Sequence, residues 1–165
     1  MQIMPLAGRR ANLFLAPLSA AMAEFDIATP LRQAAFLAQV GHESGQLRYV
    51  RELASGAAYE GRGDLGNVVA GDGVRFKGRG LLQVTGRANY AACGVALQLD
   101  LLARPELLEQ TTAACRSAGW FWQSRGLNRL ADTGDQERVT RRVNGGVNGL
   151  AERLALYAAA RKVLA

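Results

Sequence analysis

The sequence of 165 residues has few of the residues that disulfides and metal sites require, and it lacks the long apolar runs of membrane proteins. It contains two cysteines and one histidine, too few for a disulfide scaffold or for the usual zinc site. No apolar run reaches the roughly 18 residues that a membrane-spanning helix needs, so we expect no stable membrane insertion. Proline and glycine have ordinary frequencies, which argues against a collagen-like or disordered chain. At about 150 residues per domain, the length predicts a single domain, residues 1–165.

Lysine is also scarce, although the chain is basic. Lys77 and Lys162 are the two lysines, and the other 18 of the 20 basic residues are arginines. With 14 acidic residues the net charge is +6, which favours an anionic partner such as nucleic acid, a membrane surface or a bacterial wall polymer. A bias in base composition would explain the arginines equally well. Because they are scattered and cluster only over residues 138–142, we expect no nucleic-acid partner.

The N-terminal segment admits two interpretations. Residues 11–23 loosely resemble a signal peptide that ends in small residues. Apolar residues at positions 18, 21, 22 and 25 share one helical face, however, and Asn12 and Pro17 interrupt the apolar run. We therefore expect a first helix over about residues 17–25 and no signal peptide.

Helix signals follow along most of the chain. Thr29-Pro30 predicts a helix start, with the helix running to about Glu43. Further helices are expected from about Gly86 to 97, at 105–109, from a Thr111 cap to Gly126, from an Asp135 cap to Asn144, and over about 149–164. Residues 54–80 instead contain eight glycines, which predicts a long loop with a short hairpin around Val74–Phe76. The pattern indicates a mainly α domain whose Gly-rich loop lines a cleft.

Three features suggest chemistry only weakly. Gly61, Gly63 and Gly66 match a dinucleotide-binding fingerprint in letters, but no βαβ unit surrounds them. Cys93 and His42 could form a nucleophile and base, yet a cysteine between Ala and Gly is more often a small buried apolar residue. The aromatic residues 120–122 lie inside a predicted helix and are expected in the core rather than under a sugar.

The acidic residues are more informative. Between Asp26 and Asp64 the acids are Glu43, Glu52 and Glu60. Glu43 falls at the predicted end of an apolar helix, where the helix dipole and apolar neighbours favour a protonated carboxyl. That environment suits a general acid, although from position alone a solvated glutamate is the commoner explanation.

A second carboxylate across a cleft would complete the pair that glycoside hydrolysis requires. Glu52 lies nine residues after Glu43 and could fold back across a short turn. Glu60 is followed by Arg62, which suits a base but equally suits a simple ion pair. Spacing does not choose between these two glutamates.

Three blocks of sequence resemble the family 19 glycoside hydrolases, and more narrowly their phage endolysins and bacterial chitinase-like members. The blocks are FLAQVGHESG (36–45), FKGRGLLQVTGRANY (76–90), and VNGG (143–146) before a last helix with Glu152-Arg153. They stand in family order over about residues 30–164. The resemblance implies a mainly α (α+β, lysozyme-like) domain of two lobes around a central cleft. It also implies hydrolysis, with inversion, of β-1,4 links next to N-acetylglucosamine, without metal or cofactor.

The resemblance also suggests a role for individual residues. Glu43 matches the general acid and Thr85 the residue that helps to hold the attacking water. For the second acid we prefer Glu52 and keep Glu60 as a rival. Substrate-binding or active-site positions are matched by Gln83, Asn89, Tyr90, Asn144 and Arg153. Helix capping, packing or a surface ion pair could explain each of these singly.

The positive charge and the endolysin resemblance favour peptidoglycan over chitin as the glycan substrate. We expect a monomeric wall-degrading muramidase or glucosaminidase that accumulates in the host cytoplasm and reaches the wall when the membrane is breached. For inversion, its two acids should lie about 6.5–9.5 Å apart. The alternatives are a chitinase acting on chitin oligomers, an inactive glycan-binding module, a lytic transglycosylase using Glu43 alone, and a Cys/His amidase or peptidase.

Overall fold

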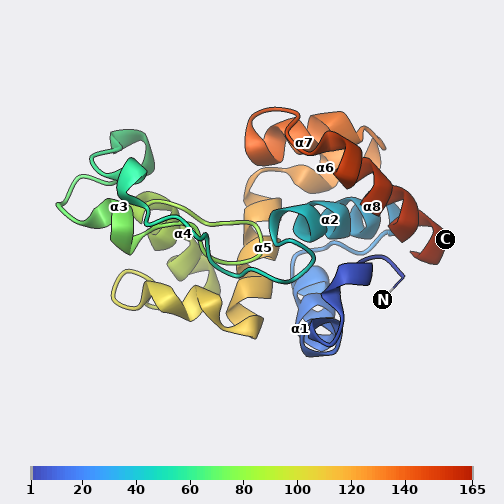
Figure 1. Ribbon diagram of the computed structural model, residues 1–165, viewed down its shortest axis with the longest axis horizontal. Coiled ribbons are helices and arrows are strands. Elements are labelled where there is room, and N and C mark those ends of the chain that lie inside the picture. Colours follow the sequence, from blue (N-terminus) through green and yellow to red (C-terminus); the bar gives the residue numbers. More distant parts are fainter. Residues whose placement is uncertain (1, 165) are drawn as a thin grey trace.

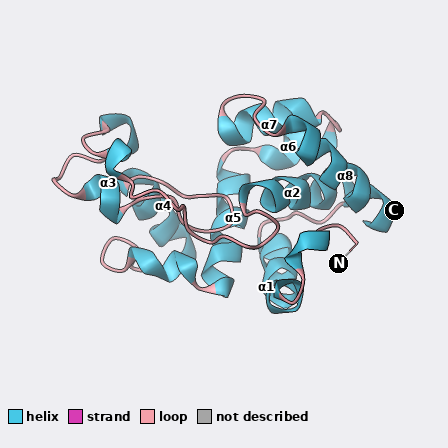
Figure 2. Ribbon diagram, in the orientation of Figure 1, coloured by secondary structure: helices cyan, strands magenta, loops and turns pink. Residues whose placement is uncertain are grey.

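Helices make up the regular structure of residues 2–164, the part of the chain that the computed structural model describes (Figures 1 and 2). The α-helices are α1 (Arg10–Glu24), α2 (Pro30–Glu43), α3 (Asp72–Arg75), α4 (Arg87–Leu97), α5 (Thr111–Ser124), α6 (Leu127–Asp132), α7 (Gln136–Asn144) and α8 (Leu150–Leu164). Short 3-10 turns are η1 (Pro5–Ala7), η2 (Ala57–Tyr59), η3 (Gly63–Leu65) and η4 (Pro105–Glu109). Over residues 2–164, β pairing is limited to two isolated bridges, Arg51 with Arg79 and Arg79 with Val84. The mainly α class is confirmed.

The larger lobe is built around α2. This helix packs against α8, while α1 packs against α5 (Figure 1). The Thr29 hydroxyl accepts a hydrogen bond from the Arg32 amide at 3.3 Å, so the predicted cap and Pro30 start the helix as expected. Phe36 meets Trp122 edge to face in the core, with ring centroids 5.3 Å apart. This packing fixes α2 and therefore the place where its last residue, Glu43, lies.

The smaller lobe contains α3 and α4 and lies at the opposite end of the molecule from both termini (Figure 1). An ion pair of 2.6 Å between Arg87 and Asp72 joins the two helices. Gly86 precedes α4 with φ +91°, and a Cβ there would lie 2.6 Å from the Leu65 Cβ, so this turn requires glycine. Loops cross from one lobe to the other (Figure 2). The two lobes carry the two walls of the site described below.

Several predicted elements need correction. The first helix spans Arg10–Glu24 rather than 17–25, because it tolerates Pro17 in its interior. The hairpin expected around Val74–Phe76 is wrong: the short helix α3 ends at Arg75, and Phe76, the next residue, is buried. Thr111 is the first residue of α5 and not its cap, and that helix ends at Ser124. Helix α6 was not predicted, since it is only six residues long and shows little periodicity.

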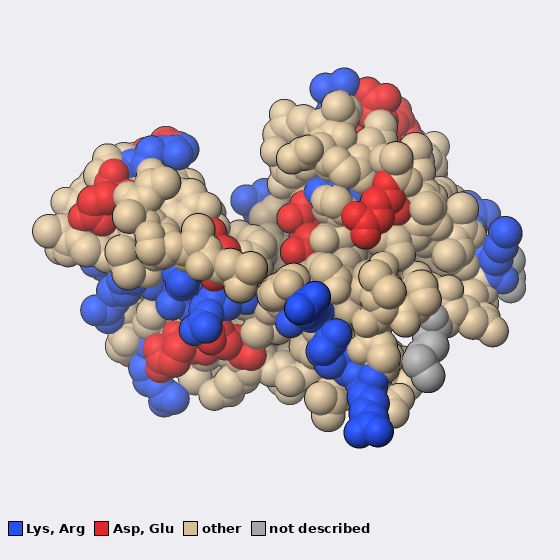
Figure 3. Space-filling model, in the orientation of Figure 1, with Lys and Arg blue, Asp and Glu red and all other residues tan. Residues whose placement is uncertain are grey.

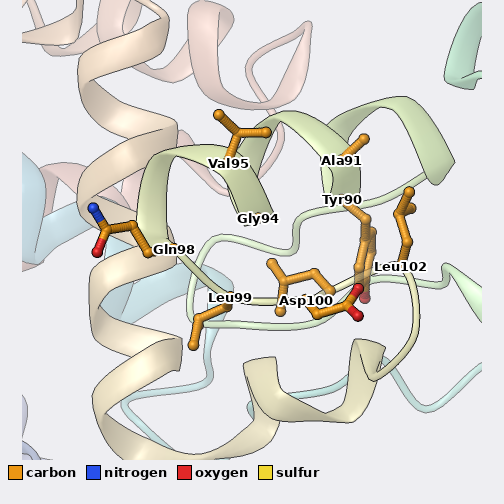
Figure 4. Close-up of a pocket in the computed structure, with 9 residues that line it drawn as sticks. Tyr90, Ala91, Gly94, Val95, Gln98, Leu99, Asp100 and Leu102 are labelled. Atoms are coloured by element: carbon orange, nitrogen blue, oxygen red, sulfur yellow. The ribbon is translucent and has the colours of Figure 1, made fainter.

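One surface pocket lies away from the interface between the two lobes. A pocket of about 400 Å³ lies between α4 and residues 98–102 (Figure 4). Its one carboxylate, Asp100, accepts a hydrogen bond from the Ala103 amide at 3.1 Å. This pocket therefore lacks the pair of acids that glycoside hydrolysis needs.

Among the described residues, no helix is both long and apolar enough to cross a bilayer.

Candidate active site

Most of the predicted site residues line one cavity of about 410 Å³ between the lobes. Figure 3 shows the surface hollowed between the two lobes, with charged atoms beside the hollow. The larger-lobe side is formed by Glu43, Trp120, Phe121, Arg125, Val143 and Asn144. The opposite side is formed by Tyr59, Leu65, Leu82, Gln83, Val84, Thr85 and Asn89. A central cleft that brings distant segments together is thus present as predicted.

Glu43 reaches this cavity from the C-terminal end of α2. Its side chain is 21% exposed, and its Oε1 accepts a hydrogen bond from Arg153 Nη2 at 2.5 Å. Apolar side chains line the same cavity, as expected, but a buried guanidinium, which the helix position did not predict, also contacts the carboxylate. The site requires both a side chain open to substrate and a fixed carboxyl position, and this ion pair supplies the second.

Arg153 is held by a buried polar network that the sequence did not reveal. The residue projects from α8, and its side chain is 1% exposed. Besides Glu43, its guanidinium donates hydrogen bonds to the Gln39 side chain and to the Asn148 carbonyl. Gln39 in turn donates to the Thr140 hydroxyl at 3.1 Å. Because a buried charge needs every donor satisfied, these contacts make Arg153 a rigid support for Glu43.

Glu52 lies behind the opposite wall of the cavity. Its backbone amide donates to the Gly78 carbonyl at 2.9 Å, which fixes the residue beside the 76–90 segment. Its Oε2 accepts a hydrogen bond of 2.9 Å from the hydroxyl of Tyr59, a residue that lines the cavity. Burial and this bond raise the Tyr59 pKa, so the phenol stays protonated as a donor. Glu52 Oε1 is buried without a hydrogen-bond donor among the described residues, so part of the acceptor capacity of this carboxylate is unused.

Three side-chain oxygens lie close together around Gly78. A carbon bonded to the Gly78 Cα would lie 3.1 Å from Glu52 Oε2, 3.3 Å from Thr85 Oγ1 and 2.6 Å from Gln83 Oε1. A carboxylate, a hydroxyl and an amide oxygen are therefore neighbours at this glycine. Thr85 and Gln83 both line the cavity. The structure thus places the preferred second acid beside two predicted site residues.

Glu60, the rival second acid, lies elsewhere. Its two carboxylate oxygens accept hydrogen bonds from the Gly71 and Gly73 amides at 2.7 and 2.8 Å. It is exposed and does not line the cavity. Its observed contacts stabilise the start of α3, where a carboxylate complements the free amides of the helix. The structure therefore favours Glu52 over Glu60.

The predicted substrate-binding polar residues keep part of their hydrogen-bonding capacity. Asn89 donates to the Thr85 carbonyl at 2.7 Å, which leaves its side-chain oxygen available. Asn144 caps its own turn, since its Oδ1 accepts from the Gly146 amide at 2.9 Å. Gln83 has φ +56°, an uncommon conformation for a residue with a side chain. Its side-chain amide donates a hydrogen bond to the Gly80 carbonyl at 2.9 Å, and this bond helps to hold the turn.

Tyr90 requires a correction, because the structure places it away from the sugar-facing wall. Its side chain is fully buried against Phe76, and its hydroxyl donates to the Lys77 carbonyl at 2.6 Å. Arg79 donates to the same hydroxyl at 3.1 Å. Burial raises the Tyr90 pKa. The residue positions the segment that carries Gly78 rather than contacting substrate.

The aromatic residues at 120–122 divide between core and cavity. Trp122 is fully buried and Phe121 nearly so, as predicted, whereas Trp120 is half-buried and lines the cavity. Arg125 lines it as well, with its guanidinium carbon 3.6 Å from the centre of the Phe121 ring. No pattern in the sequence singled out Arg125, because it falls at the end of a helix among other arginines.

The alternative nucleophile and base are not brought together. Cys93 is buried, and burial raises its pKa to about 12, which keeps the thiol protonated and unreactive. His42 Nδ1 instead lies 2.6 Å from Glu152 Oε2. Over residues 2–164, no three His, Cys, Asp or Glu side chains gather as a set of metal ligands.

Comparisons with known proteins agree with this arrangement. The family model for chitinase class I matches residues 19–132. A glycosyl hydrolase family 19 domain-containing protein of Haemophilus influenzae is 35% identical over 161 residues, covering 78% of each chain. An Arabidopsis thaliana endochitinase is 36% identical over 68% of this chain, which spans 39% of that protein's length.

Solved structures give the same result. Chitinase C from Streptomyces griseus matches with a TM-score of 0.76 and 25% identity, covering 90% of this chain and 83% of its own. A class IV chitinase from Zea mays matches with a TM-score of 0.72 and 25% identity, covering 90% of this chain and 78% of its own. The chain therefore belongs to glycosyl hydrolase family 19, whose members are glycoside hydrolases, and the family resemblance seen in the sequence is confirmed.

Proposed function

We propose that this chain hydrolyses β-1,4 glycosidic bonds of bacterial peptidoglycan by an inverting mechanism, in the manner of an endolysin. The observation that carries the proposal is the division of two acids between two lobes. Glu43 lines one wall of the cavity, and Glu52 lies behind the other, where its carboxylate and the Thr85 hydroxyl are neighbours at Gly78. Inverting hydrolysis needs this division, since acid and base act on opposite faces of the sugar.

In the proposed reaction, Glu43 donates its proton to the glycosidic oxygen as the bond to the anomeric carbon breaks. The carboxylate that remains lies 2.5 Å from Arg153, whose positive charge compensates it. Glu52 accepts a proton from a water that hydrogen-bonds to its carboxylate and to Thr85, and that water attacks the anomeric carbon from the other face. Thr85 accepts a hydrogen bond from this water or donates one to it, which fixes the direction of attack.

The choice of peptidoglycan is supported by charge and by the sequence blocks. The net charge of +6 attracts an anionic wall polymer more strongly than neutral chitin. The blocks quoted above also look like those of phage endolysins. As part of the same proposal, the chain acts as a monomer and accumulates in the host cytoplasm until the membrane is breached. Cleavage of chitin oligomers is the second candidate, because the Arabidopsis relative and the Streptomyces griseus protein named above are chitinases.

Product analysis tests the proposal. Purified peptidoglycan and N-acetylglucosamine oligomers are digested side by side, and the products are identified by mass spectrometry. We expect new reducing ends from peptidoglycan; anhydro-sugar ends would instead indicate a lytic transglycosylase. Cleavage of the oligomers alone would establish the chitinase alternative. No product from either substrate would leave a glycan-binding module.

A further inference from the structure

Arg125 is a cation in the cavity that no described acid neutralises. Of the residues that line the cavity, it is the one basic side chain described. The acid on the same side, Glu43, is already paired with Arg153. Among residues 2–164, no carboxylate lies within ion-pairing distance of Arg125. The cavity that Glu43 lines therefore presents an available positive charge.

The guanidinium is held in place, although it has no ionic partner. Its central carbon lies 3.6 Å from the centre of the Phe121 ring, and this contact holds the guanidinium over the ring while leaving its N–H groups free to donate. Its own backbone carbonyl accepts a hydrogen bond from Arg142 at 3.3 Å, so a second positive charge lies nearby. Burial lowers the Arg125 pKa, because desolvation disfavours the charged form. A half-buried charge without a partner is costly, and it is most useful where a ligand brings the opposite charge.

We propose that Arg125 binds a carboxylate carried by the glycan substrate and so selects acidic wall glycan over neutral N-acetylglucosamine polymer. Peptidoglycan carries such groups on alternate sugars, either as a free lactyl carboxylate or, where a peptide is joined to the lactyl group through an amide bond, on the peptide. A planar guanidinium binds a carboxylate through two parallel hydrogen bonds, a contact that a neutral sugar cannot supply. The inference rests on the proposed function, because it places an acidic sugar next to Glu43.

The test measures binding rather than turnover, so that it does not depend on catalysis. A Glu43→Gln protein is titrated with three ligands of equal sugar length: an N-acetylglucosamine oligomer, an oligomer with free lactyl carboxylates, and its peptide-linked form. Arg125→Gln and Arg125→Lys are then introduced into the same protein. Arg129→Gln serves as the control, since it removes the same charge from an exposed position on α6 outside the cavity.

We expect the parent to bind at least one acidic ligand about 10-fold or more tightly than the neutral oligomer. Arg125→Gln should abolish that preference, Arg125→Lys should keep part of it, and Arg129→Gln should leave it intact. Which acidic ligand shows the preference identifies the source of the carboxylate. The proposal is overturned if the parent shows no preference, or if Arg125→Gln leaves the ratio unchanged. Failure of peptidoglycan digestion by the wild-type chain would refute the proposed function separately.

Discussion

Gly78→Ala is the substitution that most sharply separates catalysis from folding in this chain. The added methyl carbon would lie 3.1 Å from Glu52 Oε2 and 3.3 Å from Thr85 Oγ1, the two groups that we assign to holding the attacking water. We expect the methyl group to displace a water bound to both groups. Loss of a positioned base and its water is expected to lower kcat by about 10²-fold or more.

The cost to folding should be small in comparison. Gly78 does not have a positive φ, so alanine is compatible with its backbone. The nearest atom, 2.6 Å away, is the tip of the Gln83 side chain, which can move. We expect an overpacking cost of about 1–3 kcal/mol, partly offset by the reduced freedom of the unfolded chain. For a domain of this size, that corresponds to a decrease in Tm of roughly 2–12 °C.

The assay compares initial rates on peptidoglycan and the thermal unfolding of wild type, Gly78→Ala and Gly63→Ala. The last variant is the control, because a methyl group on exposed Gly63 meets nothing within 4 Å. A large decrease in kcat with a folded protein supports the assigned water position. An increase in KM alone would show that the displaced Gln83 had bound sugar. Near-normal kcat and KM in folded Gly78→Ala would refute the assignment.

Two further predictions concern acids outside the cavity. Glu60→Gln should retain most of the activity and lower Tm by about 2–4 °C, because it removes roughly 1 kcal/mol of support from the start of α3; a loss of activity comparable to that of Glu52→Gln would restore Glu60 as the base. Arg87 lowers the Asp72 pKa below its usual 3.8, so this ion pair stabilises the fold fully above that pH and is lost as pH falls through the lower folded-state value. Asp72→Asn should therefore lower Tm at pH 7 and make the decrease in Tm below about pH 4 less steep. A variant whose Tm falls with pH as steeply as that of wild type would contradict the role given to this ion pair.

Local signals in the sequence predict much of the helical frame. Thr29-Pro30 and Asp135 mark helix starts by chemistry that acts within one turn, and the structure shows both caps. The loop over 54–80 is harder to predict, because short helical turns there depend on contacts between residues more than one helical turn apart. The carboxylate of Glu60, for example, stabilises α3 across more than ten residues of sequence.

The site was predictable only in part, for a related reason. Family blocks suggested Glu43, Thr85 and Arg153, and the structure brings Glu43 and Arg153 into contact. Tyr90 lies in the same block as Thr85, and no local pattern shows that its ring turns into the core. Arg125 was missed because an unpaired charge becomes visible only when the cavity and all nearby acids are known.

Turnover by Glu43→Gln tests the central claim most directly, namely that this side chain delivers a proton to the bond being cut. Glutamine keeps the size of the side chain and an oxygen that can accept from Arg153, so the fold should persist. We predict that kcat on the cleaved glycan falls by about 10²-fold or more, with circular dichroism and Tm close to those of wild type. A correctly folded Glu43→Gln protein with kcat within about threefold of wild type would contradict the account.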